Sequence, residues 1–176
     1  LSGGLKRRLN IACGISHKPE LVILDEPTVA VDAQSRKFIL DGIKNLADNG
    51  ASILYTTHYL DEAEYLCNKI SIMDNGKNIL TGDMQTLING VSVKEKITVV
   101  GYIKPEIISI LENQDDVVDV EVKENQVTLN YSNDVGNIKR LIHLLDDNNV
   151  VYEEIFSKKP KLEDIFLEMT GKELRE

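Results

Sequence analysis

The stretch Leu21-Val22-Ile23-Leu24-Asp25-Glu26-Pro27-Thr28 decides the expected fold of this chain. Its first half is a short, unbroken apolar run, which is typical of a strand that is buried on both faces of a parallel sheet. Two acids and a proline then end the strand. Open α/β sheets bind their ligands at this carboxyl end of the strands, so the stretch predicts both a sheet and a place for a site.

Helical and extended patterns alternate around this strand. A helix is expected to begin at Ser2-Gly3-Gly4 and to end before Pro19, because apolar residues recur between them at helical spacing. After the strand, the pattern predicts a helix over 33–48, a strand over 52–57, a helix over 60–67, a hairpin over 69–81 and a helix over 84–88. This alternation predicts an α/β layer structure with a mainly parallel sheet.

The pattern changes after residue 92. The expected elements are strands over 96–102, 117–122, 126–131 and 150–156, and helices over 105–112, 135–145 and 162–169. Apart from the last helix, their order is β-α-β-β-α-β, which is the ferredoxin-like pattern. We therefore predict two domains, an α/β domain over residues 1–92 and a small α+β domain over residues 93–176.

The composition fits a globular protein and disfavours two kinds of partner. Hydrophobic residues make up 42% of the 176 residues, so a core can form, and Cys13 and Cys67 are expected to be reduced, buried thiols. The net charge of −9 has the wrong sign for binding nucleic acid or an anionic membrane. No apolar run reaches the roughly 18–20 residues that span a bilayer, so any link to a membrane is expected to run through a partner.

Three side chains follow the carboxyl ends of two predicted strands. Asp25 and Glu26 follow the first strand, and His58 follows the strand over 52–57. One carboxylate here can hold a metal, and its neighbour can orient or deprotonate a water molecule, which is the chemistry of phosphoryl transfer to water. Taken alone, the acids could equally end the strand and cap the next turn, and a lone histidine is more often structural.

Ser2-Gly3-Gly4 at a helix start is an arrangement that can bind an anion. Ser2 can cap the helix, and the free backbone N–H groups at the positive helix end favour a phosphate. For three residues at the end of a chain, a simple helix cap would normally be the preferred interpretation.

Taken together and in this order, the motifs resemble those of the ABC-transporter ATPase family. LSGG (1–4) is similar to its signature motif, LVILDEPT (21–28) to its Walker B strand with the catalytic acid, Val29-Ala30-Val31-Asp32 to its D-loop, and His58 to its switch histidine. The segment 55–64 resembles in particular the ATPases of ABC-2-type exporters. Residues 95–176 resemble, more loosely, the extra C-terminal domain found on some of them.

The resemblance implies a fold, partners and a location. The fold is that of a partial P-loop NTPase domain, and the activity is ATP binding and hydrolysis that powers export through a membrane-spanning permease. In the family, two ATPase domains pair head to tail, and each ATP lies between the Walker motifs of one domain and the signature of the other. The implied location is cytoplasmic, on the inner face of the cell membrane through the permease.

The resemblance also implies roles for individual residues toward ATP and Mg²⁺. Asp25 would help to hold Mg²⁺, Glu26 would act as general base on the attacking water, and His58 would contact the γ-phosphate. Asp32 would communicate across the dimer. Ser2-Gly3-Gly4 would contact the γ-phosphate of the ATP that is bound to the other subunit.

The largest departure from the family is the glycine-rich Walker A loop, G-x-x-x-x-G-K-[ST], which is absent from the sequence. The chain begins inside a motif and without Met, which indicates a C-terminal fragment. We expect the full-length protein to be an ATPase and this chain alone to be inactive, with exposed apolar surface on its sheet. A smaller departure is Ala33, which stands where the family often has proline.

Two other functions remain open. DNA-repair and chromosome-organising ATPases share the head-to-tail dimer, but they lack the exporter-like run around His58 and are interrupted by long coiled coils. A different class is a non-enzymatic module, in which the second domain binds a partner or regulates assembly. Its acidic pairs, Asp115-Asp116 and Asp146-Asp147, could indicate a metal site, although solvated loop ends are the simpler interpretation.

Overall fold

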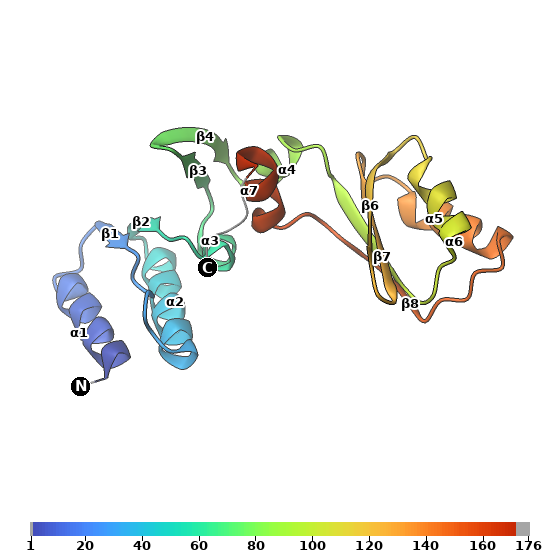
Figure 1. Cartoon of the computed structure of the whole chain (residues 1–176). Helices are drawn as coiled ribbons and strands as arrows, with labels where there is room; N and C mark the ends of the chain where they lie inside the picture. Colours follow the sequence, from blue (N-terminus) through green and yellow to red (C-terminus); the bar gives the residue numbers. More distant parts are fainter. Residues whose placement is uncertain (1, 172–176) are drawn as a thin grey trace. The chain divides into compact units, whose positions relative to one another are not determined.

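In the computed structural model, which describes residues 2–171, two parallel strands joined by a helix form the centre of the first part of the chain. The elements of this part are α1 (Gly3–Ile15), β1 (Leu21–Asp25), α2 (Ala33–Asp48), β2 (Ser52–Thr56) and α3 (Leu60–Leu66) (Figure 1). The two strands pair from Leu21 opposite Ser52 to Asp25 opposite Thr56. A parallel pair needs a crossover connection, which α2 supplies, so the predicted α/β class is confirmed.

The chain divides into two compact units, Leu1–Ile70 and Ser71–Glu176. The hairpin and the short helix after residue 70 therefore make most of their contacts within the second unit. The sequence pattern had instead placed them in the first predicted domain. The predicted domain division at residue 92 stays a prediction. No helix within the described residues combines the length and the apolar character that crossing a membrane requires.

The prediction that β1 is buried on both faces is wrong. Val22 is buried, but Leu21 and Ile23 are 58% and 65% exposed, and Leu54 on β2 is 55% exposed. Side chains alternate between the two faces of a strand, and the alternation shows that only one face of this strand pair is covered. The expected exposed apolar surface on the sheet is therefore present.

The expected burial of the cysteines is wrong for Cys13 and only partly met by Cys67. Both are free thiols, but Cys13 is exposed on α1, whereas Cys67 is partly buried after α3. Burial raises the pKa of the Cys67 thiol, because a thiolate is poorly solvated away from water. Cys67 is therefore held in its less reactive, neutral form.

The second unit begins with a hairpin and a short helix and continues into a four-stranded sheet. Its elements are β3 (Ile70–Asp74), β4 (Lys77–Gly82), α4 (Met84–Asn89), β5 (Glu95–Val100), α5 (Pro105–Glu112), β6 (Val117–Lys123), β7 (Gln126–Tyr131), α6 (Asn137–Asp147), β8 (Glu154–Lys158) and α7 (Leu162–Thr170). The hairpin turns at Asn75 and Gly76, whose φ angles are 49° and 74°. Two left-handed residues make the turn that matches the twist of paired strands.

The sheet of the second unit has the ferredoxin-like strand order. The order is β6-β7-β5-β8, and all neighbouring strands are antiparallel. Figure 1 shows α5 and α6 on the same face of this sheet. The core lies beneath them and contains Ile97, Val99, Leu129, Leu141 and Leu145, each fully or nearly fully buried. The β-α-β-β-α-β prediction is thereby confirmed.

Two predicted elements of this unit begin later than expected. The helix predicted over 135–145 is α6, which begins at Asn137 because Gly136 precedes it in a left-handed conformation (φ 71°). The strand predicted over 150–156 is β8, which pairs with β5 only from Glu154 onward. Val150 and Tyr152 instead pack against the core as part of an irregular segment.

Tyr131 gives the second unit an expected dependence on alkaline pH. The residue is 1% exposed, and burial raises the pKa of Tyr131 to about 12. In the unfolded chain tyrosine ionises near its ordinary value of about 10. Between these pH values the unfolded chain loses a proton that the folded chain keeps. The contribution of Tyr131 to the free energy of unfolding is therefore fully present below about pH 10, and it falls by up to about 1.4 kcal/mol per pH unit above that.

Urea unfolding at pH 8, 10 and 11 would measure this loss, with Tyr131→Phe as the control. The phenylalanine variant is expected to lose less stability than the parent over the same pH range. Because the Tyr131 hydroxyl is buried without a hydrogen-bond partner among the described residues, the substitution should cost little at pH 8. An identical alkaline loss in both proteins would assign the effect to other groups.

Candidate functional site

Asp25 and Glu26 lie where β1 ends beside β2, and the chain turns sharply there. Glu26 has a φ angle of 45°, a left-handed conformation that side-chain-bearing residues rarely adopt and that is concentrated at functional sites. Its N–H still donates to the carbonyl oxygen of Thr56 at 3.1 Å. The Asp25 carboxylate accepts the Thr56 hydroxyl at 2.5 Å. The end of β2 thus holds both acids.

Glu26 contacts His58, the third residue predicted for this edge. Its Oε1 atom lies 2.9 Å from Nδ1 of His58, and an ionised carboxylate can only accept, so Nδ1 carries the proton. The second oxygen, Oε2, is shielded from solvent and has no hydrogen-bond partner within residues 2–171. One oxygen of Glu26 is therefore engaged by His58, and the other has no partner among the described residues.

A buried carboxylate, Glu62 on α3, connects the segments that carry these residues. Its Oε2 atom accepts three hydroxyls, from Tyr55 at 2.7 Å and from Thr28 and Thr57 at 3.0 Å each. Its Oε1 atom lies 3.5 Å from Nε of Arg36 on α2. Glu62 is 1% exposed, and it therefore ties the chain after Glu26 to the chain before His58.

The Glu62 network was not predicted, although the sequence holds a signal for it. Glu62 lies at helical spacing with Ala63 and Leu66 of α3 and with Tyr59, the residue that precedes the helix. An acid therefore interrupts an otherwise largely apolar stripe. A buried acid needs partners, and it affects them in turn. Burial raises the pKa of Tyr55, and the hydrogen bond to Glu62 raises it further.

Arg7 is a second residue whose role was not predicted. Its guanidinium reaches from α1 to three successive carbonyl oxygens at the end of β1. Nε donates to Pro27 at 2.8 Å, and Nη2 donates to Asp25 at 3.1 Å and to Glu26 at 2.5 Å. The planar fork of arginine suits such multiple acceptors. In the sequence it stood only as part of a basic cluster, so nothing local distinguished it from its neighbours.

The remaining predicted residues form a second group at the starts of α1 and α2. Ser2 caps α1, its Oγ accepting the Leu5 N–H at 3.3 Å, and Asp32 caps α2, its Oδ1 accepting the Ser35 N–H at 2.9 Å. That backbone hydrogen bond is the main reason why the pKa of Asp32 is lowered. Both side chains thus serve as helix caps, and Leu1, the first residue of the predicted signature, lies outside the described residues.

Gly4 brings the two helix starts together. A Cβ atom at this position would lie 2.5 Å from Oγ and 2.8 Å from Cβ of Ser35, and 3.0 Å from Oδ2 of Asp32. Such distances are too short for non-bonded atoms, so glycine is required for this close approach. Gly3 lies beside the same segment, with Ala30 O 3.7 Å from its would-be Cβ.

Gly4→Ala is therefore expected to lower the free energy of unfolding by about 1–3 kcal/mol through overpacking. Gly14 is the matched control, because it lies in the same helix with nothing within 4 Å of its would-be Cβ, and Gly14→Ala should stabilise by about 0.5–1 kcal/mol. Urea unfolding measures both changes. Adding Ser35→Gly to Gly4→Ala should recover part of the loss, and equal effects of the two alanines would refute the close-approach explanation.

Asp25 is the residue here that best fits a metal ion. Mg²⁺ at phosphate-handling sites keeps several waters and takes one or two carboxylates together with the phosphates. The Asp25 carboxylate is exposed and is oriented by Thr56. Within the part of the chain that the structure describes, no group of three or more His, Cys, Asp or Glu side chains could hold a metal. As a single exposed carboxylate oriented by Thr56, Asp25 has the chemistry of a ligand to a largely hydrated Mg²⁺.

The chain is similar to known ATP-binding proteins of ABC transporters. The sequence model of the family described as "ABC transporter" matches residues 1–29. The linearmycin resistance ATP-binding protein LnrL of Bacillus subtilis (strain 168) is 37% identical over 181 residues, which cover 99% of this chain and 57% of that protein. The Nod factor export ATP-binding protein I of Sinorhizobium fredii (strain NBRC 101917 / NGR234) is 31% identical and covers 100% of this chain and 49% of that protein.

The coverage is asymmetric in each comparison. This chain spans about half the length of the curated relatives that it matches. A solved structure described as "Structure of ATP binding subunit of ABC transporter" is 30% identical and covers 51% of this chain and 38% of that chain, with a TM-score of 0.47. The similarity to known proteins is therefore taken from the sequence relatives and not from this structural match.

Proposed function

We propose that this chain, which belongs to the ABC transporter ATP-binding proteins, is part of a subunit that hydrolyses ATP to power export through a membrane permease. The observation that carries the proposal is the contact between Glu26 and His58. This contact lies beside Asp25, at the end of the strand pair. The other oxygen of the Glu26 carboxylate has no partner among the described residues. The names of the relatives speak of Nod factor export and linearmycin resistance, which supports export as the purpose.

The three residues at this edge have distinct roles in the proposal. Bound Mg²⁺ would neutralise the charge of the phosphates, and Asp25 would hold it through its exposed carboxylate. Glu26, whose Oε1 atom is in contact with His58, would accept the proton of the attacking water. His58 would orient Glu26 and contact the γ-phosphate. Arg7 would act as a positioning residue, since it holds the backbone from which both acids project.

The residues at the helix starts would act across a dimer. Backbone N–H groups at the start of α1 carry the positive end of the helix dipole, which supports contact of Ser2-Gly3-Gly4 with the γ-phosphate that a second ATPase domain holds. Asp32, which caps α2, lies against Gly4 at the start of α1. A displacement of the start of α1 would therefore also displace the start of α2. This adjacency supports the proposed role of Asp32 in communication between the two domains, which would pair head to tail.

The partners and the location follow from the same proposal. An exporter ATPase acts on a membrane-spanning permease, and we propose that the permease holds this subunit on the cytoplasmic face of the membrane. Nucleic acid is not among the proposed partners, because the net charge of −9 opposes it. ATP binding that is insensitive to added DNA would support this choice over a DNA-repair ATPase.

The test compares ATP binding and turnover by two proteins, this chain and the same chain joined to its upstream genomic sequence. Phosphoryl transfer depends on backbone donors and a lysine that a Walker A loop supplies, and these 176 residues contain no such loop. We therefore expect turnover only from the longer protein. Turnover by the shorter chain would refute its expected inactivity, and absence of turnover from both would refute the ATPase proposal.

A second candidate function applies to residues 93–176, as a non-enzymatic module that binds a partner or regulates assembly. The observation that favours it is a core of its own, formed entirely by residues between Ile97 and Leu145. Residues 93–176 expressed alone should fold cooperatively by circular dichroism. Capture of the permease by this segment without nucleotide would favour the module, and capture only by the ATP-bound full-length protein would favour the transporter subunit.

A further inference from the structure

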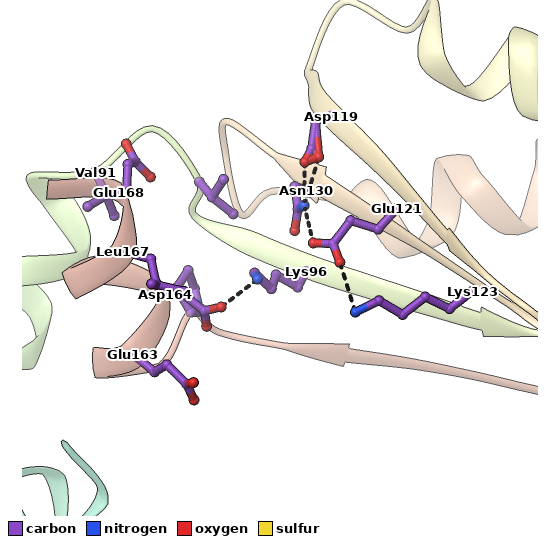
Figure 2. Close-up of a pocket in the computed structure, with 12 residues that line it drawn as sticks. Val91, Lys96, Asp119, Glu121, Lys123, Asn130, Glu163, Asp164, Leu167 and Glu168 are labelled. Atoms are coloured by element: carbon purple, nitrogen blue, oxygen red, sulfur yellow. Dashed lines mark hydrogen bonds and ion pairs between the residues drawn. The ribbon is translucent and has the colours of Figure 1, made fainter. Parts of the chain in front are cut away.

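A groove of about 490 Å³ lies in the second unit, on the face of the four-stranded sheet that α5 and α6 leave open. Side chains alternate along each strand, and Lys96 and Asn130, a cross-strand pair, point away from the core that Ile97 and Leu129 form. Figure 2 shows that one wall of the groove comes from this sheet face and the other from α7. The groove is separate from the Glu26 site, which lies in the first unit.

The groove carries more negative than positive groups. The carboxylates that line it are Asp119, Glu121, Glu163, Asp164 and Glu168, and the ammonium groups are Lys96 and Lys123. Lys96 pairs with Asp164 at 2.6 Å, and Lys123 lies 3.5 Å from Glu121. After these pairings the sheet wall and the helix wall both retain excess negative charge, which favours a cation as ligand.

Asn130 is an independent observation that points to a ligand with a hydrogen-bond donor. It is 3% exposed, and its Nδ2 donates to Oδ1 and Oδ2 of Asp119 at 3.1 and 3.0 Å and to Oε1 of Glu121 at 3.3 Å. Two carboxylates that can only accept settle which end of the amide is nitrogen. The oxygen, Oδ1, is buried and has no hydrogen-bond partner within residues 2–171.

The unpartnered oxygen is directed into the groove. Figure 2 shows it turned away from Asp119, on the side where the ends of Lys96 and Glu121 lie. Buried polar atoms are almost always paired, and an amide oxygen needs a donor. A donor that is also positively charged would satisfy Asn130 and the surrounding carboxylates at once.

We propose that this groove binds an organic cation, whose ammonium or guanidinium group donates to Oδ1 of Asn130 and pairs with Asp119 and Glu121. A metal ion fits less well, because the amide nitrogen faces both carboxylates and its oxygen cannot converge with theirs on one point. Two sources share the required chemistry, a free polyamine and a basic side chain of a peptide.

The experiment titrates the whole ¹⁵N-labelled chain with spermidine and, separately, with a capped tri-arginine peptide, and follows binding by calorimetry and NMR. Both probes are expected to bind with one-to-one stoichiometry and to shift the side-chain amide signals of Asn130. The double variant Asp119→Asn/Glu121→Gln should weaken binding by at least about tenfold, since it removes both charges that face the ligand. The control Asp146→Asn/Asp147→Asn removes the same charge at the end of α6 and should change affinity less than about twofold.

A third variant keeps the test decisive if the double variant folds poorly. Lys96→Gln removes a competing ammonium group from the groove and releases Asp164. The affinity for the cation should therefore rise several-fold. If Lys96 had only a structural role, its loss would not raise this affinity. Tighter binding of the peptide assigns the site to a protein partner, and tighter binding of spermidine assigns it to a free polyamine; both results support the proposal. Equal weakening by the two double variants, absence of an Asn130 shift, or Ca²⁺ binding more tightly than either probe would overturn it.

Discussion

Glu26→Gln is expected to reduce ATP turnover by about 10²–10⁴-fold in the protein that joins this chain to its upstream sequence, because it removes a general base. Glutamine keeps the volume of glutamate but cannot accept a proton at neutral pH. ATP binding should persist, since the proposed metal-holding group is Asp25. Single-turnover kinetics and an ATP-binding assay measure the two properties separately.

Glu20→Gln is the matched control for Glu26→Gln. Glu20 is exposed and precedes β1, so the same change lies at the opposite end of the same strand, and turnover should stay within about twofold of the parent. Because His58 contacts Glu26 directly, the loss caused by His58→Ala should not add fully to that of Glu26→Gln. Unchanged turnover in Glu26→Gln would remove Glu26 from the mechanism.

Glu62→Ala is expected to lower the free energy of unfolding of the first unit by about 3–5 kcal/mol, the cost of removing one partner from a buried charged network. The substitution leaves the hydroxyls of Thr28, Tyr55 and Thr57 without their shared acceptor and deprives Arg36 of its carboxylate. Glu62→Gln retains one acceptor oxygen and should cost less, about 1–3 kcal/mol. Urea unfolding followed by circular dichroism and tyrosine fluorescence measures these changes.

Asp61→Ala provides the control for Glu62. Asp61 is the preceding residue of α3 and is exposed, so its removal should cost only about 0.3–1 kcal/mol through the helix dipole. Similar losses in Asp61→Ala and Glu62→Ala would show that α3 tolerates the loss of its buried acid. Glu62 would then not position the segments on either side of the site.

Local patterns predicted most of the secondary structure. The helices over 33–48 and 105–112 and the strand over 126–131 agree in both bounds with α2, α5 and β7. The local pattern predicted the start of the strand over 150–156 wrongly, because strand pairing there depends on the neighbouring strand β5. Gly101 approaches Tyr152 closely, its would-be Cβ lying 3.0 Å from the Tyr152 Cα, and β5 ends at Val100. Val150 and Tyr152 therefore pack against the core without strand pairing, and β8 begins only at Glu154.

The sequence by itself determined where Asp25, Glu26 and His58 would lie, because successive parallel strands bring their carboxyl ends to one edge of a sheet. Only the tertiary structure decided what these residues contact. The contact between Glu26 and His58 spans 32 positions along the chain, and the bond between Thr28 and Glu62 spans 34. Periodicity encodes which face of an element is apolar, whereas contacts over such separations depend on how whole elements pack and which rotamers they permit. For that reason the burial of Glu62, the reach of Arg7 and the unpartnered oxygen of Asn130 emerged only from the folded chain.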